Sequence, residues 1–149
     1  MSYLAKRGEW YWAELIHEIT IEGDERNVIH KNLILIHATG PEQAYESANE
    51  IGLRQNSRYL NPAGVLVQSR FRGLGGLDII HDDLEHGSEI LYEEIVSVPE
   101  ERIKRWIRAQ KDLQLFQTGD DVIQGRPDFS SKEIADEVER RLKTTENER

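Results

Sequence analysis

Cysteine is absent from this chain of 149 residues, and so are long apolar runs. Without cysteine the chain has no disulfide, no thiolate nucleophile and no thiolate zinc site. No apolar stretch approaches the roughly 20 residues that a membrane-spanning helix needs. Glu9 and Glu14 interrupt the first apolar run, and no small-residue cleavage site follows it, which argues against a secretory signal. We therefore expect neither a membrane segment nor thiol chemistry.

The chain is rich in negative charge: it has 28 acidic and 19 basic residues, and its net charge is −9. This balance is typical of an ordinary acidic cytosolic surface and argues against nucleic acid as a partner of the whole surface. The bases gather in residues 100–116, which carry 3 acids against 5 bases. The stripe formed by Arg102, Arg105 and Arg108 is an alternative contact for nucleic acid, although a solvated helix face is the favoured interpretation.

Two segments near the start have the pattern of strands. Residues 10–21 alternate, with one face clearly more apolar than the other. Residues 28–38 are rich in β-branched and aliphatic side chains, and residues 33–36 are apolar on both faces, which predicts a central strand. A polar loop between the two segments predicts an antiparallel hairpin.

A helix is predicted after this hairpin. A capping box begins at Thr39, and Pro41 fits the first helical turn, where its missing N–H costs nothing. Ala44 and Ala48 share one face and would let the helix lie close to a sheet. Gly52 predicts the end of the helix, because glycine adopts the left-handed conformation of a C-terminal cap.

The second half of the domain is predicted to add three strands. Residues 53–64 are expected to be irregular, and residues 65–72 show the cleanest alternation in the chain. A glycine-rich turn at residues 73–76 is expected to return the chain into a strand at 77–81. Residues 89–98 alternate again and predict the last strand.

The resulting order, ββαβββα, predicts an α+β domain over residues 1–116, with a mainly antiparallel sheet of four to five strands packed by helices. Its last helix is expected to run from Pro99 to about residue 116. Residues 117–129 are predicted to be a linker, and residues 130–149 a detached C-terminal helix with a frayed end. The narrow apolar stripe of that helix predicts docking on its own domain, a homo-oligomer, or binding in a groove of a partner protein.

The candidate site that stands out is formed by Trp10 and Trp12 on one predicted strand and Arg70 and Arg72 on another. Tryptophan and arginine are enriched among the residues that dominate protein–protein binding energies. If the two strands are neighbours, the four side chains form an aromatic and cationic patch that would bind another protein. In the alternative, a helix covers the tryptophans and the arginines pair with local carboxylates.

Histidines and acids provide two further candidates. Asp78, His81, Asp83 and His86 could assist a metal-dependent hydrolysis, but their spacing matches no metal motif, and an acidic loop is the favoured interpretation. His17 and His30 are predicted to be diagonal neighbours across the hairpin, where they could share a metal or a proton, against a favoured structural role. By the same register His37 would lie opposite Trp12.

Several short motifs also follow one another in a particular order. They are a W-Y-x-A-x-L opening, a helix of the form E-x-A-x-x-x-A, a V-x-V-x-x-x-F-x-G strand and turn, and a loop with G-x-E-x-x-Y. These motifs are formed by Trp10, Tyr11, Ala13, Leu15, Glu42, Ala44, Ala48, Val65, Val67, Phe71, Gly73, Gly87, Glu89 and Tyr92, with Tyr59, Asn61 and Gly64 between them. In this order they resemble the small bacterial family known as domain of unknown function 4288, over residues 9–98. The resemblance implies a compact α+β domain in a bacterial cytoplasm and brings no catalytic or binding residues with it.

Taken together, the residues favour a non-enzymatic protein-interaction module, with a regulatory or toxin-neutralising accessory role as a narrower hypothesis. No catalytic residue, metal ligand or cofactor is predicted, because no cofactor fingerprint and no nucleophile–base spacing occur in the sequence. The alternative function is a small metal-assisted hydrolase that uses the loop from Asp78 to His86.

Overall fold

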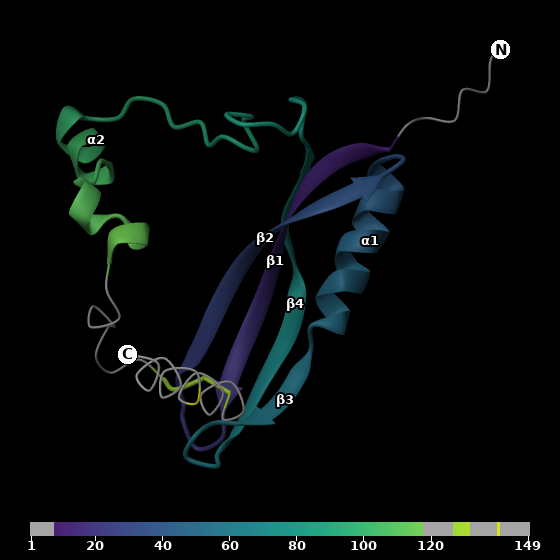
Figure 1. Ribbon diagram of the computed structural model, residues 1–149, viewed down its shortest axis with the longest axis vertical. Helices are drawn as coiled ribbons and strands as arrows, with labels where there is room; N and C mark the ends of the chain where they lie inside the picture. The colour runs from purple at the N-terminus through teal and green to yellow at the C-terminus, as the bar shows by residue number, and fades with distance from the viewer. Residues whose placement is uncertain (1–7, 118–126, 132–139, 141–149) are drawn as a thin grey trace. The chain divides into compact units, whose positions relative to one another are not determined.

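In the computed structural model, residues 8–117, 127–131 and 140 are described. They form an α+β fold in which four antiparallel strands build one sheet and a helix covers one of its faces (Figure 1). The predicted class of fold is therefore confirmed. The elements are β1 (Glu9–Ile21), β2 (Asn27–Ala38), α1 (Pro41–Arg54), β3 (Ser57–Leu60), β4 (Leu66–Ile79), α2 (Glu100–Trp106) and two short 3-10 turns, η1 (Gln110–Asp112) and η2 (Gln114–Phe116).

The strand order across the sheet is β2-β1-β4-β3. β1 and β2 form the predicted hairpin, and their register is unbroken from Glu9 opposite Ala38 to Thr20 opposite Asn27. In the polar loop between them, hydrogen bonds from the Arg26 side chain and backbone lower the pKa of Asp24 to about 2. β2 was expected to be central, but in the described sheet it is an outer strand. β2 is apolar on both of its faces, although it pairs with a described strand along one edge alone.

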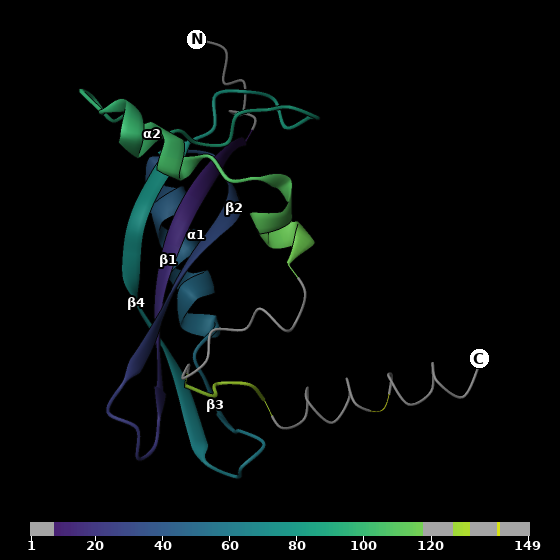
Figure 2. The same ribbon diagram turned by 90° about the vertical axis from the view of Figure 1, so that its left-hand side faces the viewer.

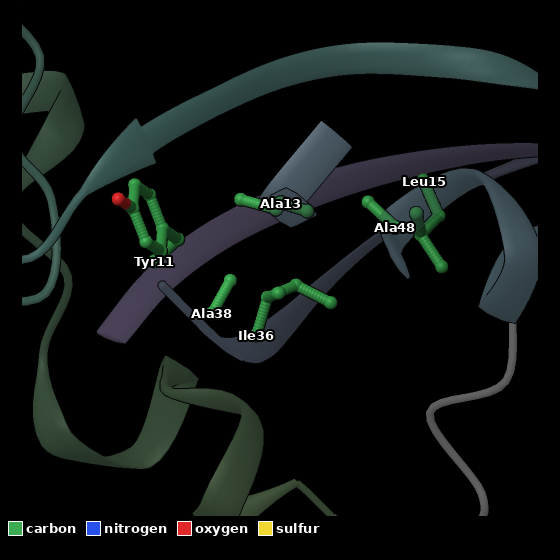
Figure 3. Packing of buried hydrophobic residues seen from close by; sticks show 7 residues of the cluster. Tyr11, Ala13, Leu15, Ile36, Ala38 and Ala48 are labelled. Atoms are coloured by element: carbon green, nitrogen blue, oxygen red, sulfur yellow. The ribbon is translucent and has the colours of Figure 1, made fainter. Parts of the chain in front are cut away.

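The main core lies between the sheet and α1. Alternate residues of β1 point to the same face of the sheet as the helix and are almost completely buried, because the side chains of a strand point to opposite faces in turn. On the helix side, Ala44 and Ala48 have no exposed surface, and their small side chains let α1 pack directly on the strands. Figure 3 shows this packing, in which the buried cluster consists of Tyr11, Ala13, Leu15, Ile36, Ala38, Ala44 and Ala48.

α1 continues beyond its predicted end. Gly52 lies within the helix and is buried, and the helix extends to Arg54. A Cβ atom at Gly52 would lie only 2.5 Å from the ring of Phe71 on β4. This glycine is needed for the close approach of helix and sheet, so the prediction that it ends the helix was wrong.

A second, smaller cluster lies at the end of the sheet that holds β3. Ile19, Ile21 and Val67 are its buried members, and Phe129 packs against them from far along the chain. The Tyr59 hydroxyl donates a hydrogen bond to the backbone carbonyl of Phe129. These contacts fix residues 127–131 on the sheet, at the end of the segment predicted to be a linker.

β4 differs from the prediction in its middle. The glycine-rich stretch 73–76 is not a turn, because the strand runs through it without reversing. Instead, the register between β1 and β4 shifts twice, between Glu14 and Leu15 and between Ile16 and His17. Such bulges add an extra residue to one strand and bend it locally.

Two other elements were predicted wrongly. Residues 57–60, expected to be irregular, form β3 and pair with β4. Residues 89–98, predicted to be a strand, form no strand and pair with none of the described strands. A strand needs backbone partners, and an alternating pattern alone does not provide them.

The chain divides into two compact units, residues 1–91 with 127–149 and residues 92–126. In the second unit α2 ends at Trp106, and η1 and η2 replace the rest of the predicted helix. None of the described residues from 92 to 117 is buried. Most of the predicted linker and C-terminal helix lie outside the described residues. Among the helices that are described, none has the length and apolar character required to cross a bilayer.

Candidate functional site

The face of the sheet opposite α1 carries large apolar side chains that no described element of the same unit covers. We call it the open face, and it is turned towards the viewer in Figure 2, where α1 lies behind the strands. Trp10 is 41% exposed, Leu33 55% and Leu35 48%. The open face therefore presents apolar surface where a one-layer sheet normally presents polar side chains to water.

One end of the open face is aromatic. Trp12 lies opposite Leu35 on one side and Asp78 on the other. Its half-buried indole lies across the backbone of Gly76, where an added Cβ would come within 2.7 Å of the ring. Trp10 lies opposite His37, with the two ring centroids 4.8 Å apart. His37 is therefore the partner of Trp10, and its predicted position opposite Trp12 was wrong.

The glycines of β4 form a platform for these side chains. A Cβ at Gly75 would meet the side chains of Glu14 and Ile16, just as one at Gly76 would meet Trp12. Side chains of β1 thus lie flat over β4 instead of standing up from the sheet. Sequence reasoning missed this role because a run of glycines usually marks a turn. The signal that could have revealed it is the large side chain at every second position of β1.

The other end of the open face is cationic. The Arg72 guanidinium donates a hydrogen bond of 2.9 Å to Glu18, and an Arg70 nitrogen lies 3.9 Å from the same carboxylate. Asn27 donates a further hydrogen bond of 2.7 Å to Glu18. This bond and the charges of Arg72 and Arg70 lower the pKa of Glu18. The carboxylate of Glu18 therefore interacts with both arginines, and these three side chains together carry one net positive charge.

The two ends of the open face are well separated. β1 and β4 are neighbours, as the predicted patch requires, but the register places Trp12 opposite Asp78 and Glu18 opposite Arg70. From Trp12 to Glu18 the strand extends about 20 Å at the ordinary rise per residue. Each pair of predicted residues is brought together, whereas the tryptophans and the arginines do not form one compact patch.

The alternative interpretation had two parts: that a helix covers the two tryptophans and that the two arginines pair with local carboxylates. α1 does not cover the tryptophans, because it lies on the other face of the sheet. The arginines do contact a local carboxylate, Glu18. Arg70 nevertheless remains 65% exposed at its side chain, so its charge is accessible to a partner.

The histidine pair lies on the covered face. His17 and His30 are directly opposite each other and not diagonal as predicted. His17 is 3% exposed, and its two ring nitrogens have no hydrogen-bond partner among the described residues. Its ring lies 5.5 Å from that of Phe71, while the His30 ring contacts Phe129 at 5.1 Å. The pair is therefore part of the packing between the two core clusters and is separate from the open face.

The acidic loop offers no assembled metal site in the part of the chain that the structure describes. No group of three or more His, Asp or Glu side chains there could hold a metal ion. Asp78 accepts a hydrogen bond from the backbone of Ile79, and Asp82 accepts one from the backbone of Glu89. These carboxylates thus order the local backbone. The metal-assisted hydrolase remains a prediction, and no arrangement of the described side chains supports it.

The basic stripe lies in the other unit. Arg102, Arg105 and Arg108 are all exposed, and Arg105 donates a long hydrogen bond of 3.4 Å to the backbone carbonyl of Glu101. Arg102 and Arg105 lie on α2, whereas Arg108 lies beyond its end at Trp106, so the three arginines do not form one helical stripe as predicted. Their exposure agrees with a solvated surface and adds nothing that selects nucleic acid.

The arrangement defines a class: a small α+β domain whose antiparallel sheet is covered by a helix on one side and carries exposed aromatic and aliphatic residues on the other. Residues 10–92 match the family described as Domain of unknown function (DUF4288), and the chain belongs to this family. The match confirms the resemblance derived from the order of the motifs. No curated protein and no solved structure matches the chain.

Proposed function

We propose that the chain is a protein-interaction module and that its partner binds the open face of the sheet. The observation that carries the proposal is the aromatic end, where Trp12 is held flat across Gly76 beside exposed Trp10 and Leu35. Fixed aromatic side chains lose little conformational freedom on binding, which is why they dominate the energy of many interfaces.

The cationic end supports a partner with an acidic group. Arg70 and Arg72 exceed the charge of Glu18 by one, so a carboxylate of the partner would be attracted there. Exposed charges of this kind mainly accelerate association and fix the orientation of the partner. The proposed partner therefore presents an apolar area and, about 20 Å away along the same surface, an acidic group. A regulatory or toxin-neutralising role in a bacterial cytoplasm is the narrower form of this proposal.

Alanine variants of the two ends test the proposal. Tagged wild-type protein and the variants Trp12→Ala and Arg70→Ala are used to capture proteins from native extract, and the captured proteins are quantified. We expect one stoichiometric partner that binds Trp12→Ala at least about tenfold more weakly, as for a central aromatic contact. Arg70→Ala should weaken capture less, and its effect should diminish with added salt.

Matched controls lie on the other side of the sheet. Tyr45 and Arg54 are exposed on α1, so Tyr45→Ala and Arg54→Ala remove the same kinds of side chain away from the open face. Both controls should capture the partner like the wild type, and circular dichroism should show that all variants are folded. Equal capture by the open-face variants and the controls, or no stoichiometric partner at all, would contradict the proposal.

A further inference from the structure

β2 is a long outer strand of the described sheet. It spans 12 residues, contains no proline, and has no bulge in its pairing with β1. No described strand pairs with its outer edge. The backbone N–H and C=O groups along such an edge form a template for another strand, and proteins normally protect it with charges, prolines or bulges. Here none of these is present except one lysine.

The composition of β2 indicates what kind of strand would pair with it. Charged residues make up 32% of the chain, whereas Lys31 is the only charged residue among the 12 of β2. On the open face, Ile29 is 47% exposed, and Leu33 and Leu35 are about half exposed. The centres of protein interfaces are depleted of charge in this way.

We propose that two copies of this chain pair through their β2 edges, antiparallel and about a two-fold axis, into one continuous sheet of eight strands. The net charge of −9 opposes a general approach of two copies, but the edge that would pair carries only one charged residue in each copy, Lys31. Symmetry makes the edge its own partner, since each copy supplies the same alternating apolar side chains.

The sequence of β2 also selects a register. In an antiparallel pair about a two-fold axis, residues on the same face lie opposite each other. An axis at Lys31 would place the two lysines face to face, which is unfavourable. An axis at Asn32 places Lys31 opposite Leu33 of the second copy and Ile29 opposite its Leu35. This register pairs residues 27–37 of both copies, which is nearly the full length of β2.

The pairing would extend the open face without covering its tryptophans. Because the two-fold axis is perpendicular to the sheet, both α1 helices lie on the same side and both open faces on the other. The dimer would thus present two copies of the proposed partner-binding surface side by side. It goes beyond the proposed function and does not depend on it, because the pairing involves this chain alone.

The test is the oligomeric state of the purified chain and of three glutamate variants, measured by sedimentation over a range of micromolar concentrations. We expect a dimer for the wild type. Leu35→Glu would place a carboxylate opposite Ile29 of the second copy, twice per dimer, and should produce monomers. Leu33→Glu would place its carboxylate opposite Lys31 and should preserve the dimer. Leu53→Glu, on the exposed surface of α1, is the matched control and should remain dimeric.

Each other outcome overturns part or all of the proposal. A monomeric wild type, or a dimer that all three variants preserve, excludes β2 as the interface. Dissociation by Leu33→Glu with preservation by Leu35→Glu excludes the axis at Asn32 and moves it to Leu33. Dissociation by both excludes the proposed pairing of Leu33 with Lys31.

Hydrogen exchange provides a second measurement that needs no variant. The outward N–H groups of β2 should exchange more slowly as the concentration rises, whereas those of β3, the other outer strand, should not change. Concentration-independent exchange along β2 would exclude the pairing even if Leu35→Glu failed to fold. Failure of this test leaves the capture experiment with Trp12→Ala unaffected, because that experiment concerns a different partner.

Discussion

At the scale of single residues, the glycines of β4 show how an absent side chain can organise a surface. Trp12, Glu14 and Ile16 lie over positions 75 and 76, where any Cβ atom would collide with them. The absence of a side chain at Gly76 therefore determines the orientation of the indole. Without this platform the indole would have to stand away from the sheet or adopt another rotamer.

The variant Gly76→Ala tests this arrangement. Its Cβ atom would fall within 2.7 Å of the Trp12 ring, so the indole has to move. We expect the free energy of unfolding to fall by about 1–3 kcal/mol, the usual cost of overpacking. The emission of Trp12, recorded in a Trp10→Phe, Trp106→Phe background, should shift to the red as the ring becomes more exposed.

A glycine without close neighbours provides the control. Gly40, before α1, has an extended backbone with φ of −179°, and nothing lies within 4 Å of an added Cβ. Gly40→Ala should leave the emission of Trp12 unchanged. If Gly76→Ala also leaves both the emission and the stability unchanged, the platform has no effect on the tryptophan.

At the scale of elements, the segment 127–131 closes the second core cluster. Phe129 covers Ile19, Ile21 and Val67, and its backbone carbonyl accepts the Tyr59 hydroxyl. We expect Phe129→Ala to lower the free energy of unfolding by about 1–3 kcal/mol, less than for a fully buried phenylalanine because the ring is only partly buried. Urea denaturation followed by circular dichroism measures the change.

Ser130→Ala is the control for this segment, because Ser130 is exposed and its hydroxyl donates a hydrogen bond to the nearby side chain of Asp128. Its unfolding midpoint should stay close to that of the wild type. A Phe129→Ala variant with the same midpoint would show that the segment contributes nothing to the stability of the sheet.

The elements also show which features can be predicted from sequence. The presence of β1, β2 and α1 was predicted because their patterns are local: alternation in β1, β-branched and aliphatic residues in β2, and proline and alanine positions in the helix. The place of β2 in the sheet and the end of α1 depend on other elements, and both were predicted wrongly. β3 was missed and residues 89–98 were mistaken for a strand, since pairing depends on which backbone edge lies nearby in space. Propensity and alternation contain no information about that edge.

In the candidate site, too, the local features were predicted and the spatial ones were not. The types of residue that matter, Trp10, Trp12, Arg70 and Arg72, were identified, and their two strands are neighbours. Their separation along the sheet was not predictable, because it depends on the register and on two bulges in β4. The role of Leu33 and Leu35 was misread for a related reason, since a strand that is apolar on both faces resembles a central strand.

At the scale of the whole molecule, the two units differ in how their side chains are buried. All the described core residues belong to the unit built around the sheet, whereas residues 92–117 bury none of their side chains. We expect limited trypsin digestion to cut first at the basic residues between Arg102 and Lys111. Protease access requires local opening, which costs little where few contacts hold the backbone.

Basic residues within the strands serve as internal references for this digestion. Cleavage at Lys31 and Arg70 requires the sheet to open and should follow much later. Mass spectrometry of early fragments identifies the sites. Simultaneous cleavage in the two groups would show that the units unfold together.

Because Phe129 packs on the sheet, the chain is attached to the sheet unit both before and after residues 92–126. This attachment determines how insertions in that segment affect the fold. The residues that flank the segment from 92 to 126 on both sides belong to the sheet unit, so that segment is an insertion within this unit and not a tail. The entropic cost of closing a flexible loop rises by only about 0.6 kcal/mol for each doubling of its length. The segment can therefore be lengthened, or replaced by an inserted domain, while the sheet retains its fold and its open face.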